Sequence, residues 1–187
     1  WSSDVCSSDL VQTNGGSGLG GTISFDAFNA ININGQLLAN SQSATAGLIT
    51  LEADHILLDS QANLQATGAT GGGTILVGGD WQGSGTLRQA TSVTMNQGAF
   101  IDASATQNGD GGKVVLWTDI TNPISVTSVQ GEISVQGGLN GGKGGRVETS
   151  GSTIKFVGSV YKLNSRDGQS ENGLWFIDPS YAYSTIG

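Results

Sequence analysis

Short segments of alternating apolar and polar residues, each opened by a glycine, recur along this chain. In residues 47–53 the alternation places Ile49 and Leu51 on one face of a strand and Thr50 and Glu52 on the other. Six such segments begin at Gly21, Gly47, Gly73, Gly112, Gly145 and Gly173. Successive starts are 26, 26, 39, 33 and 28 residues apart, so the spacing lengthens from 26 but never shortens. A period that only takes insertions predicts a solenoid.

Each turn of this solenoid reads as three short strands separated by corners rich in Asp, Ser, Gly and Asn. Middle strands are expected over residues 30–33, 55–59, 93–95, 124–126 and 154–156. No long segment has a helical period. We therefore predict an all-β fold, a right-handed parallel β-helix of about five to six turns. The residues expected inside the stack are Ile49, Leu51, Ile75, Val77, Val114, Leu116 and Val147.

The third turn is the longest and carries 13 residues beyond the shortest period. These extra residues fall most plainly in residues 79–89, which we expect to project from the stack as a loop or small hairpin. Trp81 lies in this loop, and Trp117 follows a strand at a position that points outward. Both are candidate surface contacts for a sugar ring or a partner protein, and packing over a corner is the alternative for each.

The two ends of the chain limit the extent of the predicted domain, and its charge limits the classes of partner. Residues 1–10 read as a translated sequencing adapter, so residues 11–187 are taken as a single β-helix fragment cut at one or both ends. Open solenoid ends predict self-association. The net charge of −8 argues against nucleic acid as a partner, and no run of apolar residues is long enough to span a membrane.

Motifs for cofactors, metals and catalysis are weak. The glycines of residues 16–21 match a dinucleotide pattern but lead into a strand instead of a helix, so no cofactor is expected. The single histidine, His55, is interpreted as a corner or surface residue, and no metal site is expected. Asp26 and Glu52 lie outward on neighbouring turns and are interpreted as solvated charges, so no catalytic residues are assigned.

Several longer phrases together resemble one protein family. They cover residues 75–85, 103–119, 137–151 and 174–179, and they are similar to the filamentous haemagglutinin-type exoproteins. The resemblance implies a shaft that is secreted or displayed on the bacterial surface, exported by two-partner secretion through an outer-membrane transporter. One departure matters, since the Asn-Pro-Asn motifs of the family's secretion domain are missing here. Asn122-Pro123 is followed by isoleucine.

The resemblance implies a section of an adhesin that contacts a host-cell or glycan receptor through an extended surface or loops. Such a section is not an enzyme. Two alternatives remain open. One is a carbohydrate-active β-helix enzyme of the pectate-lyase kind, which would need two or more acids close together on an outer face. The other is a haem-acquisition exoprotein that acts on a host haem carrier through its loops.

Overall fold

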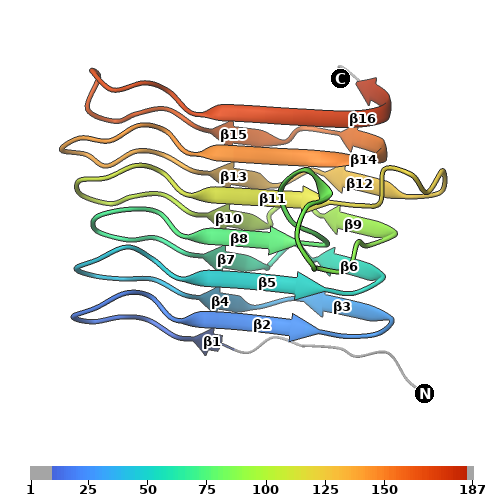
Figure 1. Cartoon of the computed structure of the whole chain (residues 1–187), viewed down its shortest axis with the longest axis horizontal. Helices are drawn as coiled ribbons and strands as arrows, with labels where there is room; N and C mark the ends of the chain where they lie inside the picture. The colour runs from blue at the N-terminus through green and yellow to red at the C-terminus, as the bar shows by residue number, and fades with distance from the viewer. Residues whose placement is uncertain (1–9, 185–187) are drawn as a thin grey trace.

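Parallel strands stack turn upon turn through residues 10–184, the part of the chain that the computed structural model describes (Figure 1). The first strands of the turns are β2 (Thr22–Asp26), β5 (Leu48–Glu52), β8 (Thr74–Val77) and β11 (Lys113–Trp117). The middle strands are β3 (Ala30–Ile33), β6 (His55–Leu58), β9 (Ser92–Met95) and β12 (Val126–Val129). In the last turns, β14 (Arg146–Phe156) and β16 (Leu174–Ser184) run through the first and middle positions without a break.

The third strands form a separate sheet on the other side of the stack. They are β1 (Leu10–Gln12), β4 (Gln36–Leu38), β7 (Asn63–Gln65), β10 (Phe100–Asp102), β13 (Glu132–Ser134) and β15 (Val160–Lys162). Every strand pair in both sheets is parallel, which confirms the predicted parallel β-helix. The residues described here contain no helix with the length and apolar character of a membrane span.

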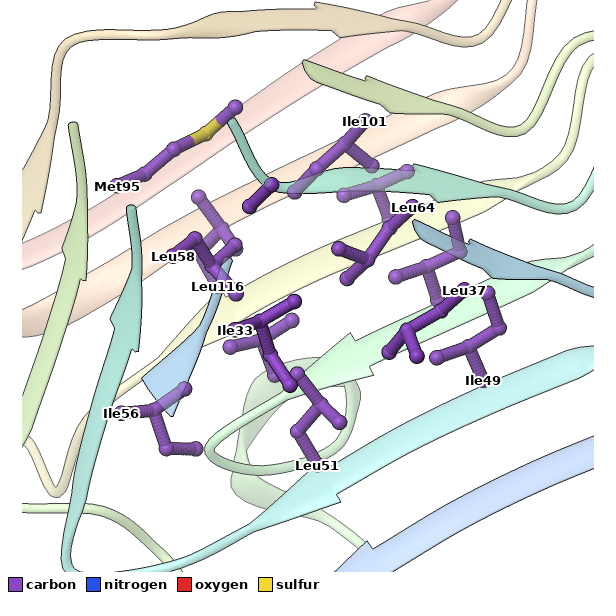
Figure 2. Packing of buried hydrophobic residues seen from close by; sticks show 14 of the residues in the cluster. Ile33, Leu37, Ile49, Leu51, Ile56, Leu58, Leu64, Met95, Ile101 and Leu116 are labelled. Carbon is purple, nitrogen blue, oxygen red and sulfur yellow. The ribbon is translucent and has the colours of Figure 1, made fainter. Parts of the chain in front are cut away.

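The interior is built from like residues placed on like residues. Ile49 pairs with Ile75, Ile75 with Val114, and Val114 with Val147, so one ladder runs through four turns. All seven residues predicted to lie inside have no solvent exposure. Figure 2 shows side chains from the different strands converging on this common core. The apolar side chains of successive turns therefore share one core that runs along the stack.

The middle strand of the fourth turn differs from the prediction. The strand was expected over residues 124–126, yet it begins only at Val126, and Ile124 lies before it with 73% of its surface exposed. Thr127 takes the inward position opposite Val93. Its hydroxyl lies 3.0 Å from the Thr118 hydroxyl and donates to the Ser150 carbonyl at 2.8 Å. A hydrogen-bonded polar side chain can thus occupy an interior position that the neighbouring turns fill with Val93 and Ile154.

The start of the stack also differs by one residue. Leu10, which the sequence places in the non-native segment, lies in β1 and pairs with Gln36. The rest of that predicted segment, residues 1–9, is outside the described residues.

Gly47 is required at its corner because stacked turns approach closely there. A β-carbon at this position would lie 1.8 Å from the Gly21 carbonyl oxygen. We expect Gly47→Ala to lower the free energy of unfolding by about 1–3 kcal/mol, as overpacking does in a close-packed interior. Denaturant melts check this. Gly16→Ala is the matched control, because its β-carbon would meet nothing within 4 Å. Equal melts for both variants would contradict a packing role for the corner glycines.

Candidate functional site

The insertion of the third turn lies over the outer face of the long sheet instead of projecting from it. We call residues 79–90 the flap; they connect β8 to β9 and include the short 3-10 helix η1 (Trp81–Gly83). Figure 1 shows this loop passing in front of β8 and β11. Asp80 caps η1, since its carboxylate accepts the Trp81 N–H at 2.6 Å. The predicted projecting loop is therefore wrong.

Trp117 is covered by the flap. Its indole lies on the outer side of the sheet, as the alternation predicts, but it is only 1% exposed. The ring packs in one cluster with Val115 of its own strand and Leu76 of the neighbouring strand β8, and its Nε1 donates to Gln89 Oε1 of the flap at 3.1 Å. The prediction of Trp117 as a surface contact is thus corrected. An apolar strip on the outer face needs cover, and the flap supplies it.

Trp81 remains partly accessible at the edge of the flap. Its ring centroid is 6.0 Å from that of Phe176, and the Arg146 guanidinium carbon lies 4.9 Å from the ring centroid. A cation over an indole face is attracted by the ring quadrupole. Trp81 therefore holds Arg146 on the outer face, and its role as a contact for a partner stays a prediction.

Two acids at the start of the stack hold the far end of the flap. Arg88 Nη2 lies 2.7 Å from Asp26 Oδ1, and the backbone N–H of Arg88 donates to Glu52 Oε2 at 2.9 Å. A further Arg88 nitrogen donates to the Phe28 carbonyl at 2.9 Å. Asp26 and Glu52 are consequently more than solvated charges, because they receive the single arginine of the flap.

Glu148 lies buried beneath the other end of the flap. Its Oε2 accepts the backbone N–H of Gln82 at 2.8 Å, and its Oε1 accepts the Ser150 hydroxyl at 2.9 Å. Desolvation raises the pKa of Glu148 above its usual value, and the nearby Asp178 and Asp80 act in the same direction, while the two hydrogen bonds oppose them. Asp80 itself pairs with Lys113 at 3.1 Å. The sequence reasoning did not single out Glu148, although the alternation along residues 145–151 places it outward next to the apolar strip.

The raised pKa of Glu148 predicts a pH dependence of stability. A carboxyl group with a higher pKa in the folded chain binds more protons when folded, so stability falls as pH rises from the usual value of 4.5 through the raised one. We expect Glu148→Gln, which mimics the neutral acid, to gain stability relative to the unmodified chain across this interval. Urea melts between about pH 4 and pH 8 check it.

Glu171 supplies a control of opposite sign. Lys143 lowers the pKa of Glu171 through a hydrogen bond and its charge, so the stability contributed by this group is lost as pH falls. Glu171→Gln should therefore approach the unmodified chain at acid pH. A stability difference for Glu148→Gln that does not change with pH would contradict the buried carboxylate.

Among residues 10–184, no cluster of three or more histidine, cysteine, aspartate or glutamate side chains is placed to hold a metal ion. His55 instead contacts Ser92, with Nδ1 2.9 Å from the hydroxyl, and its Nε2 lies 3.5 Å from Asp54.

Comparison with known proteins is informative only at the level of structure. No family model matches the sequence, and no curated protein matches it. The fold is similar to the crystal structure of the HMW1 secretion domain from Haemophilus influenzae, with a TM-score of 0.61 and 23% sequence identity. The match covers 88% of this chain and 45% of that one, so this chain spans less than half of its neighbour's length. The likeness establishes the shared fold.

Proposed function

We propose that this chain is a section of an exported bacterial protein of the two-partner secretion type. The observation that carries the proposal is the likeness of its fold, over 88% of the chain, to a secretion domain. The phrases that resemble filamentous haemagglutinin-type exoproteins lie in the same β-helix and add support. The export partner of the parent protein is an outer-membrane transporter, and the localisation is extracellular or at the bacterial surface.

Within such a protein we assign the segment an adhesive role, as a shaft that contacts a host-cell or glycan receptor. A stack of turns offers long faces to a partner instead of one enclosed cavity. Trp81 is a partly exposed aromatic group of the flap, and aromatic side chains supply much of the contact energy when a partner buries them. We assign no catalysis to the face, since both oxygens of the buried Glu148 are engaged in hydrogen bonds.

Export can be tested with a fusion. Residues 11–187 are placed behind the secretion domain of a two-partner system and expressed with and without its transporter. We expect the chain in the medium or on the cell surface only when the transporter is present. Retention in the periplasm in both strains, with the carrier domain alone exported normally, would contradict the proposal.

Attachment can be tested with beads coated with the chain and incubated with epithelial cells. We expect binding above that of albumin-coated beads, and Trp81→Ala should reduce it about fivefold or more, as loss of an aromatic anchor does. Leu139→Ala is the control, because it also removes an exposed apolar side chain, 61% exposed, from a different corner of the stack. Attachment at the albumin level, or cleavage of a polysaccharide by the chain, would overturn the adhesive assignment.

A further inference from the structure

A groove runs along the stack at the corner that precedes the first strands. Two open hollows of about 460 and 500 Å³ adjoin there and share Gly72, Gly73, Thr74 and Lys113, so they follow one another along the stack. Its floor consists of paired glycines, which are present because the stacked corners pack too closely for side chains. A β-carbon on Gly111, for example, would lie 2.0 Å from the Val135 carbonyl oxygen. The shape fits a linear, extended ligand.

The groove gathers positive charge in an acidic protein. Lys113, Lys143 and Arg146 line it, which is three of the seven basic residues of a chain with a net charge of −8. The outward first residues of the strands form one wall, since Lys113 pairs with Arg146 and Thr74 in the sheet register. Asp110 also lines the groove, and its carboxylate accepts the backbone N–H of Lys143 at 2.8 Å.

The three cations differ in how free they are to bind a ligand. Lys113 is the least free, because its pair with Asp80 is well shielded, with side-chain exposures of 21% and 27%. Lys143 pairs with Glu171 at 2.7 Å, but these side chains are 58% and 77% exposed. An exposed ion pair of this kind contributes little and exchanges readily. Arg146 has no carboxylate within ion-pair distance among the residues that the structure describes, and Trp81 covers one face of its guanidinium.

The backbone of the corner is not available to a peptide strand. The N–H groups of Leu48, Lys113 and Arg146 donate to the glycine carbonyls of the preceding turn. Binding must therefore go through side chains, namely the edge donors of Arg146 and the ammonium of Lys143, with the glycine floor giving close approach. Asp110, Asp80 and Glu171 beside the groove would repel a densely charged ligand. A polymer with one carboxylate per ring matches two available cations better than a sulfated chain does.

We propose that this groove binds a linear polyuronate, with Arg146 and Lys143 contacting its carboxylates and Trp81 acting as the positioning residue for Arg146. The inference rests on the proposed adhesive function and names the class of glycan that the shaft would contact. A guanidinium supported on an indole is already oriented, so less side-chain freedom is lost when it binds a carboxylate.

Calorimetric titration with polygalacturonate oligomers tests the proposal. We expect saturable binding that weakens with salt, and no binding of the fully methyl-esterified oligomers, which keep the shape and lose the charge. Arg146→Gln with Lys143→Gln should weaken binding by about tenfold or more, the effect of losing a charge-assisted hydrogen bond. The control is Lys155→Gln with Lys162→Gln, which removes the same charge from positions outside the groove and should leave affinity within about twofold. Thermal melts of both variants establish that they fold.

Several outcomes would contradict the proposal that this groove binds a polyuronate. These are equal losses in the two double variants, equal binding of esterified oligomers, tighter binding of heparin oligomers than of polyuronate, or no binding at all. The adhesive function fails separately. If coated beads attach to cells but the chain does not bind polyuronate, the groove proposal is wrong and the adhesive function stands. If the chain binds polyuronate through the groove but the beads do not attach to cells, the groove proposal stands and the adhesive function is wrong.

Discussion

Leu116→Ala should lower the free energy of unfolding by about 2–5 kcal/mol, the range for truncating a buried leucine to alanine. Leu116 has no solvent exposure and lies in the interior ladder between Val77 and Thr149. The neighbouring turns are fixed by their own hydrogen bonds, so the cavity cannot collapse easily. Denaturant melts followed by circular dichroism measure the loss.

The matched control for this prediction is Leu139→Ala, which removes the same atoms from a side chain that is 61% exposed. It should change stability by no more than about 0.5 kcal/mol. Similar losses in the two variants would mean that the interior ladder is wrongly assigned.

Trp117→Ala should have a comparable effect for a different reason. The indole fills the space between the sheet and the flap, and its loss should cost about 3–5 kcal/mol as a large-to-small change at a buried aromatic. The variant also lacks the hydrogen bond from the Trp117 indole to Gln89 of the flap, so the flap should open. Arg88 is the flap's only basic residue, so limited trypsin digestion should then cut after Arg88.

Trp81→Ala is the control for Trp117→Ala, because it also removes an indole from the outer face. Trp81 is partly exposed, so its loss should destabilise the fold less than the loss of Trp117. If Trp117→Ala melts like the unmodified chain and stays resistant to trypsin, the indole does not hold the flap.

The fold was predictable because its signal is local and repeated. Each first strand has a glycine and an alternating segment at a fixed distance, and the seven predicted interior residues are all buried. The fourth middle strand was mispredicted because Thr127 is satisfied by two other polar groups that sequence spacing does not bring together. The continuous β14 was also missed, since Gly151 and Ser152 read as a corner but continue the strand.

The arrangement of the candidate site was less predictable because its contacts join distant residues. The insertion could be located by its length, but Arg88 meets Asp26 across 62 positions and Gln82 meets Glu148 across 66. One signal was available in the alternation. It places Leu76, Val115 and Trp117 outward on adjacent turns, and an apolar strip of that kind calls for a covering segment.

The flap has a mechanical consequence for a shaft. It leaves the stack after β8, yet it is tied to β2 through Asp26, to β5 through Glu52, to β11 through Lys113 and to β14 through Glu148. The bonds between turns lie along the stack axis, so tension along that axis loads the turns in series and the weakest pair separates first. The flap runs alongside five turns, so its side-chain contacts carry part of the load that would otherwise fall on the interfaces between these turns.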